Sequence, residues 1–275
     1  MLRHAKSFEG CELHARDGSI GRVKDVYFDD ERWHVRYFVV DAGSWLVGRK
    51  VLISPGAVTA PRYDQGTLET GLTQEQVRGS PQIDTDRPVS RQQELELNRY
   101  YAWPYYWTAP VLGTGFIPAA AAPSPAALRA EIAPKERAFS QSRVEAGAAA
   151  DARDAEAGDP HLRSAHTVRG YSIGARDGSI GHVEDFLIDD ETWAVRCLLV
   201  DTRNWWPGRK VLVPLARIRA IEWNQSKLDV DLTRDAIKQG PELDASRPLA
   251  AEDTRRLEAY YQTHAERMPN AERMP

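Results

Sequence analysis

The sequence predicts a mainly β protein that consists of two small β-barrels, each followed by short helices and joined by a disordered linker. Two observations carry this prediction. The segment Ala15–Ile53 returns without a gap as Ala175–Val213, so one whole domain is present twice and the chain is not a solenoid of short units. In both copies, short alternating runs of apolar residues are separated by tight turns, which is typical of a small closed barrel.

The two copies match over most of their length. Roughly four positions in ten are identical between Gly10–Tyr101 and Gly170–Tyr261. Between the copies, the composition changes to an aromatic and proline-rich stretch and then to alanine, proline and charged residues, which do not build a packed core. The predicted organisation is a first repeat with its C-terminal helix, a linker, a second repeat with its helix and a disordered tail, at residues 1–101, 102–160, 161–264 and 265–275.

The elements of the first repeat follow from the apolar pattern and the turn residues. Met1–Ser7 is expected to be a loose terminal segment. Thr73 is a preferred N-cap residue and starts a short helix, and Ser90–Tyr101 predicts a second helix. The second repeat is expected to contain the same elements. The strands expected in the first repeat are Gly10–His14, Gly21–Phe28, Trp33–Asp41, Gly48–Ile53, Ala57–Tyr63 and Thr67–Thr70.

Two turns fix the expected hairpins. An Asp-Gly pair between extended segments predicts a tight turn, because glycine adopts the positive φ that such a turn needs; these pairs are Asp17-Gly18 and Asp177-Gly178. The next hairpin is expected to place Phe28 opposite Trp33. That register puts charged residues directly across from one another on the outer face, where opposite charges stabilise a sheet. The predicted structural pairs are Asp25 with Arg36 and Asp185 with Arg196.

Composition excludes several classes of function. The formal net charge is −4, and a protein that binds bulk nucleic acid carries a strong basic excess instead. Cys11 and Cys197 do not occupy equivalent positions and are expected to be buried thiols that behave as small apolar residues. The first residues lack the apolar core of a signal peptide, and no apolar run approaches the length of a membrane span. We therefore expect a cytoplasmic protein.

The search for catalytic or metal chemistry gives no candidate. There is no phosphate-binding loop and no nucleophile-elbow motif, and no histidine within one repeat has a histidine counterpart in the other. The acidic triplets that begin at Asp29 and Asp189 are expected to be solvated turns rather than cation sites. Asp41 and Asp201 end buried strands and are expected to cap them. We predict no catalytic residues, no cofactor and no metal ion.

The whole pattern resembles a known family. The run from Arg16 to Ile53, followed by LTQEQVRGSPQID and a helix that ends in Tyr-Tyr, is similar to the PRC-barrel domain. This module is shared by the cytoplasmic part of the photosynthetic reaction-centre H subunit and by the ribosome maturation factor, and the part after the barrel is more similar to the reaction-centre branch. The chain lacks the membrane helix of the one and the RNA-handling domain of the other. The resemblance implies a bacterial protein that docks onto other proteins.

Two classes of function remain open. The first is a non-enzymatic adaptor whose barrels dock onto protein partners, onto each other or onto a second chain. The second is an accessory or assembly factor of a photosynthetic or electron-transfer membrane complex, acting from the cytoplasmic side. Tryptophan and arginine often carry interface energy, so the loop before the fourth strand is the predicted docking surface. Its residues are Trp45, Arg49, Lys50, Trp205, Trp206, Arg209 and Lys210. The alternative is that Trp45 and Trp205 fold back as lids over the barrel end.

Overall fold

The computed structural model describes residues 1–83, 85, 88–106, 161–202, 210–241 and 248–266 of the chain. These residues form two compact units, and the boundaries of the units do not coincide with those of the repeats. The first unit comprises Phe8–Glu31 and Arg36–Arg163, and the second comprises Met1–Ser7, Arg32–Val35 and Ser164–Pro275. Each repeat therefore contributes short segments to the other repeat's unit.

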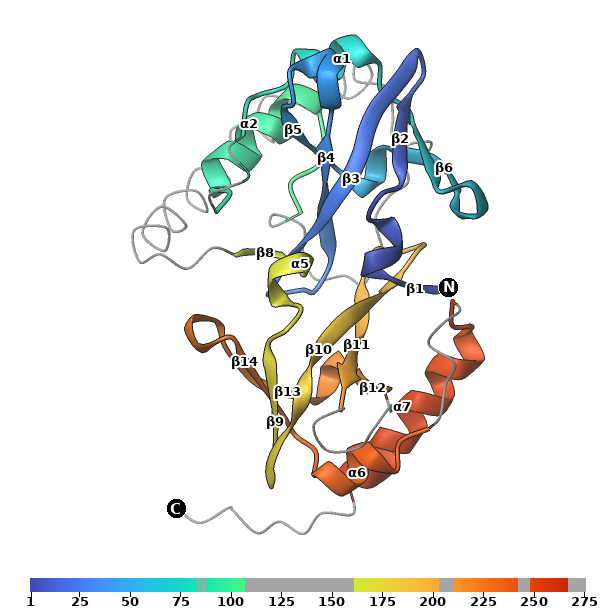
Figure 1. Ribbon diagram of the computed structural model, residues 1–275, viewed down its shortest axis with the longest axis vertical. Coiled ribbons are helices and arrows are strands. Elements are labelled where there is room, and N and C mark those ends of the chain that lie inside the picture. The colour runs from blue at the N-terminus through green and yellow to red at the C-terminus, as the bar shows by residue number, and fades with distance from the viewer. Residues whose placement is uncertain (84, 86–87, 107–160, 203–209, 242–247, 267–275) are drawn as a thin grey trace, which may run out of the picture. The chain divides into compact units, whose positions relative to one another are not determined.

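The first unit is built on a seven-stranded sheet with the order β5-β4-β3-β2-β7-β6, in which β8 also pairs with β3. Six strands come from the first repeat, as predicted. The seventh, β8, comes from the start of the second repeat (Figure 1). The strands are β2 (Glu12–Ala15), β3 (Gly18–Asp29), β4 (Val35–Asp41), β5 (Lys50–Ile53), β6 (Val58–Arg62), β7 (Thr67–Thr70) and β8 (Leu162–Ser164).

The second unit repeats this plan. Its sheet has the order β12-β11-β10-β9-β14-β13, and β1 from the start of the first repeat pairs with β10. In Figure 1, the blue strand β1 accordingly lies beside the yellow and orange strands of this unit. The strands are β1 (Leu2–His4), β9 (Ser172–Ala175), β10 (Gly178–Asp189), β11 (Val195–Asp201), β12 (Lys210–Pro214), β13 (Ile218–Glu222) and β14 (Lys227–Val230).

Short helices follow each sheet. Thr73 and Ser90 both cap helices through reciprocal capping boxes with the glutamines three residues on, which satisfies backbone N–H groups that lack partners within the helix. None of the helices in the described parts of the chain is long and apolar enough to span a bilayer. The helices that follow the sheets are α1 (Gln74–Arg78), α2 (Arg91–Tyr101), α6 (Arg234–Lys238) and α7 (Ala251–Glu266), and α5 (Ala165–Val168) lies between β8 and β9.

A tight turn forms at each Asp-Gly pair, but its two residues are Arg16-Asp17 and Arg176-Asp177 and the glycine begins the next strand. Each aspartate has a second role. Asp17 Oδ1 accepts a hydrogen bond of 2.8 Å from the Gln74 backbone N–H at the start of α1. Asp177 does the same for Arg234 at the start of α6, also at 2.8 Å. The turn thus fastens the helix that follows the sheet. Gly18 and Gly178, with φ values of 153° and 132°, close the hairpins by pairing with Ala15 and Ala175.

The expectation that Met1–Ser7 is a loose segment is wrong. This segment contains β1, and a short 3₁₀ turn over Ala5–Phe8 follows directly. Local sequence patterns indicate strand pairing within one repeat, and a three-residue strand whose partner lies in the distant repeat gives no such pattern. The predicted linker and tail lie mostly outside the described residues. The linker's first residues, however, belong to the first unit: Trp103 packs against its core.

The predicted register is also wrong for the hairpin of β3 and β4 and for the equivalent hairpin of β10 and β11. In the second unit, Asp185 lies opposite Leu199, three residues beyond the predicted Arg196. Next to the turn, Ile188 already faces Val195 instead of the predicted Trp193, and an irregularity between Leu187 and Ile188 moves the register by one more residue. A β-bulge adds one residue to one strand and changes which side chains face each other. In the first unit, Arg36 donates to Asp29 at 2.6 Å, so the predicted Asp25–Arg36 pair is replaced as well. Arg196 lies 3.8 Å from the equivalent Asp189.

The core of the first unit includes a residue from the second repeat. Leu162 of β8 is 6% exposed and packs in one buried cluster with Val89, Leu97 and residues of β4 and β5. Burying a leucine side chain stabilises a fold by about 1.5–3 kcal/mol. The exchanged strand is therefore part of the core and not an addition to its surface.

Candidate strand-docking site

Each unit holds a short extended segment from the other repeat along its longest strand. We call Met1–Ser7 and His161–Arg163 the donor segments, and β10 and β3 their acceptor strands. In the second unit, Leu2, Arg3 and His4 pair in antiparallel register with Asp189, Ile188 and Leu187. On its other edge, Leu2 exchanges two backbone hydrogen bonds with Leu249, of 3.0 and 2.9 Å. The segment thus completes the sheet by backbone pairing.

Side chains add specificity to this pairing. Leu2 is buried, with 4% of its surface exposed. Arg3 Nε donates to Asp190 Oδ2 at 2.6 Å, and the amino group of Met1 contacts the other carboxylate oxygen of Asp190 at 2.6 Å. His4 Nδ1 lies 3.0 Å from Asp185 Oδ2. A basic segment with one buried leucine therefore lies on an acidic acceptor.

The first unit holds its donor segment with the equivalent contacts. Leu162 occupies the place of Leu2, and Arg163 Nε donates to Asp30 Oδ2 at 2.7 Å, as Arg3 does to Asp190. The Asp30 N–H donates to the His161 carbonyl at 3.1 Å, and the Asp190 N–H donates to that of Met1 at 3.0 Å. The two sites thus bind a Leu-Arg segment through equivalent contacts.

The acidic triplets are part of these sites. Asp29 is 3% exposed and bonds Arg36, while Asp30 bonds Arg163 of the donor segment. The expectation that the triplets are merely solvated turns is therefore wrong for these residues. The carboxylates bind arginine side chains, which sequence reasoning could not foresee because one partner lies more than a hundred residues away.

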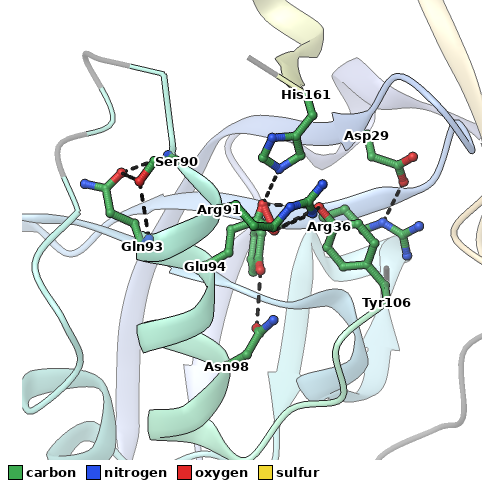
Figure 2. Close-up of polar contacts among 10 residues, drawn as sticks. Asp29, Arg36, Ser90, Arg91, Gln93, Glu94, Asn98, Tyr106 and His161 are labelled. Atoms are coloured by element: carbon green, nitrogen blue, oxygen red, sulfur yellow. Dashed lines mark hydrogen bonds and ion pairs between the residues drawn. The ribbon is translucent and has the colours of Figure 1, made fainter. Parts of the chain in front are cut away.

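The first unit also contains a buried polar cluster around Glu94 of α2, and Figure 2 shows how its side chains converge. Glu94 is fully buried. Its Oε1 lies 2.7 Å from His161 Nε2, and its Oε2 accepts a hydrogen bond of 2.8 Å from the Tyr106 hydroxyl. Arg91 Nη1 donates to the same hydroxyl at 2.8 Å and lies 3.5 Å from Glu94. The guanidinium of Arg36 lies 3.8 Å from the centre of the Tyr106 ring.

The cluster fastens the donor segment instead of presenting a reactive group. Burial, with the Glu94 charge as second cause, raises the pKa of Tyr106 and of Tyr37 well above the ordinary range, so both phenols keep their protons. Both carboxylate oxygens of Glu94 are occupied by side chains of this unit. His161 comes directly before β8, and the cluster therefore anchors the start of the donor segment to α2. A buried network of this kind is stable only when its members are satisfied.

The second repeat lacks equivalents of Glu94 and Arg91 of this cluster and of the nearby Tyr37. Thr254 stands at the position of Glu94, Ala251 at that of Arg91, and Cys197 at that of Tyr37. Cys11 and Cys197 are free and buried, as expected. Burial raises the pKa of both thiols, to about 12 for Cys197.

The predicted docking loop has internal partners in the first unit. The Trp45 indole N–H donates to the Ile20 carbonyl at 2.8 Å, which favours the lid interpretation. Arg49 Nη2 donates to the carbonyls of Ser80 and Pro81 at 2.5 and 2.7 Å, where it satisfies backbone acceptors beyond α1. Lys50 is exposed. Trp205, Trp206 and Arg209 lie outside the described residues, so the docking role of this loop stays a prediction.

Two strand-end aspartates differ in their surroundings. Asp41 Oδ1 accepts a hydrogen bond of 2.9 Å from the Gly43 N–H, as expected for a residue that caps a strand end. Asp201 is fully buried and groups with His182 and Glu184 at a spacing that could hold a metal ion. However, Lys210 Nζ lies 2.7 Å from Glu184 Oε1 and lowers the pKa of that carboxyl through its hydrogen bond. The lysine already supplies the positive charge there, and we assign no metal.

Comparison with known proteins agrees with this architecture. The model of the PRC-barrel domain family matches residues 2–69 and 160–238. The chain belongs to the PRC-barrel family. Both matched segments begin at or before the donor leucines. The chain is also 32% identical over 71 residues to an uncharacterized protein of Deinococcus radiodurans, a match that covers 26% of this PRC-barrel chain and 25% of the relative's length.

One pattern in the sequence could have revealed the exchanged segments. Leu2-Arg3 recurs as Leu162-Arg163 at the same spacing as the rest of the repeat, and an alanine follows two residues later in both copies. A recurrent apolar-basic pair at the start of both copies argues against a loose terminus. The identity of the acceptor strand, by contrast, could not be found in this way.

Proposed function

We propose that this PRC-barrel protein is a non-enzymatic adaptor that docks other proteins by adding their extended segments to its sheets. The observation that carries the proposal is the donor segment itself. Each unit binds a short segment from a distant part of the chain by backbone pairing with β3 or β10, by burial of one leucine and by an arginine–aspartate contact. Strand addition is a common mode of peptide recognition, in which the backbone supplies affinity and alternate side chains supply specificity.

The chemistry of the acceptors defines the partner segment. On β10 and in the turn after it, Asp185 and Asp190 contact His4 and Arg3, so the acceptor favours a basic segment. The buried Leu2 requires an apolar residue directly before the arginine. A partner that carries an exposed, extended Leu-Arg pair fits this site. Complementary charge also raises the rate of encounter.

A peptide experiment tests the proposal. A labelled peptide with the sequence MLRHAKSF is added to the full-length chain carrying R3A, which weakens the chain's own donor segment. We expect saturable binding that is tighter than binding to the parent chain, because the parent's segment competes at high effective concentration. The measurement is fluorescence anisotropy against protein concentration.

The matched control exchanges the charges. A peptide in which aspartate replaces the arginine should bind the full-length chain with D190R and fail to bind the chain with R3A, whereas the original peptide should do the reverse. Circular dichroism checks that each variant is folded. Equal binding of both peptides to both variants, or no binding to any, would refute strand addition at β10.

The second class of function, an accessory role at a photosynthetic or electron-transfer membrane complex, stays a prediction. Nothing among the described residues favours it over docking in general. Genomic neighbours that encode such a complex would support it.

A further inference from the structure

We infer that a second copy of this chain is a partner for the strand-docking site: the donor segment Met1–Ser7 of one copy occupies β10 of another. This inference rests on the proposed function and names one occupant of the proposed site. Three observations support it, namely the reciprocity of the exchanged contacts, the composition of the segment, and the difference between the two donor segments.

The exchanged contacts are reciprocal residue by residue. The Val35 N–H donates to the Trp193 carbonyl at 2.8 Å, and the Val195 N–H donates to the Trp33 carbonyl at 2.7 Å. Between these bonds, His34 pairs with Ala194, its own counterpart in the second repeat. Leu2 and Leu162 likewise enter equivalent places. In a contact between two identical chains, residue i meets j and j meets i, and the tandem chain shows this pattern internally.

The donor segment Met1–Ser7 therefore makes a contact of the kind that joins two copies of one domain. All the contacts of Met1–Ser7 described above are made with residues of the second unit, and a second copy offers the same residues. Exchange between two copies remakes each contact and creates none that is new, which is why exchange of an identical element is a low-cost route to a dimer. The remaining cost is the entropy of association, which falls in importance as the protein concentration rises.

The two donor segments are not equally free to exchange. His161 is held by the fully buried Glu94, and Leu162 lies in the core cluster of the first unit. Arg3 and His4 contact Asp190 and Asp185, which are 10% and 5% exposed. Water therefore has more access to these two carboxylates than to Glu94, and it weakens the ion pairs that they form. The segment that exchanges between copies is therefore Met1–Ser7.

Two full-length variants test the inference when they are mixed. One carries R3D and the other carries D190R, so that in either variant alone the donor segment and its acceptor bear like charges at this position. In a reciprocal exchange between the two, both contacts again join opposite charges. We expect the mixture to form a species of twice the chain mass by size exclusion with light scattering. The single chain with R3D and D190R together should remain a monomer, like the parent.

A second measurement keeps the test decisive if a charge variant does not fold. Arg3 and Ile188 are directly paired, and paired residues of antiparallel strands are close enough for a disulfide. A copy with R3C is mixed at high concentration with a copy with I188C and then oxidised. We expect a disulfide between the two chains whose yield rises with concentration. The inference is overturned if the mixed variants stay monomeric and no disulfide forms between chains, while the chain with both cysteines closes its internal bond.

These outcomes are separate from those of the peptide experiment. If the peptide binds but copies do not exchange, the docking function stands and the second copy is not its partner. If the peptide does not bind, the docking function itself fails.

Discussion

The two donor segments make the same backbone pairing and the same leucine and arginine contacts, yet they are fastened differently. His161–Arg163 is held at its start by Glu94, which is fully buried, whereas Met1–Ser7 is held by Asp190 and Asp185, which are 10% and 5% exposed. Backbone pairing thus defines where a segment binds, and side chains around it define how firmly it is retained. A buried, satisfied polar cluster retains more firmly because a broken contact inside it leaves an unpaired charge.

The largest expected effect is at the centre of the buried cluster. Glu94→Ala leaves Arg91, His161 and Tyr106 without their shared acceptor, and we expect a loss of about 3–5 kcal/mol from the free energy of unfolding of the first unit. Thr254→Ala, the matched change in the second repeat, should cost less than about 1 kcal/mol. Denaturant unfolding, monitored for each unit by the hydrogen exchange of β3 or of β10, measures both losses of stability. Equal effects of the two changes would remove the distinction between the segments.

The next effect tests which unit each leucine stabilises. Leu162→Ala should lower the stability of the first unit by about 2–5 kcal/mol, although Leu162 belongs to the second repeat by sequence, and Leu2→Ala should do so for the second unit. The cause is the cavity left in the core that receives the leucine. Hydrogen exchange of peptides from β3 and from β10 reads out each unit separately. A loss confined to the leucine's own repeat would contradict the exchange of strands.

A third pair compares two equivalent arginines. Arg36 and its partner Asp29 are 8% and 4% exposed and 2.6 Å apart, whereas Arg196 and Asp189 are 48% and 22% exposed and 3.8 Å apart. Arg36→Ala should cost about 1.5–3 kcal/mol, as expected for a hydrogen bond between charged groups that water does not reach. Arg196→Ala should cost under about 1 kcal/mol. Thermal unfolding at low and high salt should show salt dependence only for the second pair.

Sequence alone predicted most of the fold and little of the site. The six strands of the first repeat, the positions of the turns at the Asp-Gly pairs, the helix cap at Thr73 and the helix over Ser90–Tyr101 follow from local patterns, and the structure confirms them. The seventh strand of each sheet was missed because its partner lies in the other repeat. The register was missed because the predicted strands began at Trp33 and Trp193, which instead lie before the strands with positive φ, and because the irregularities in β10 have no marker in the sequence.

The buried cluster was missed for a related reason. Glu94, Tyr106 and His161 lie in three segments that sequence reasoning assigned to a helix, a linker and the start of the second repeat. Each residue alone looks like a solvated side chain. Only the folded chain brings them together, and only then does the absence of equivalents at Thr254 and Ala251 become informative.

The smallest expected effect distinguishes the units by pH at the position where Tyr37 and Cys197 are equivalent. Burial raises the pKa of Cys197 from its ordinary value of 9.0 to about 12, and burial and then Glu94 raise that of Tyr37 well above 10.0. A group whose folded pKa is raised contributes stability that is fully present below its unfolded pKa and is lost as the pH rises through the folded pKa. Burial also raises the pKa of Cys11 in the first unit, so the comparison is made in a chain that carries Cys11→Val. In that chain the second unit should begin to lose stability just above pH 9 and the first unit only above pH 10. The stability of each unit as a function of pH is measured by hydrogen exchange, corrected for the intrinsic pH dependence of the exchange rate. Cys197→Val should remove the early decline in the second unit alone. A decline that persists in Cys197→Val would mean that another group titrates there and that the buried thiol does not set the difference between the units.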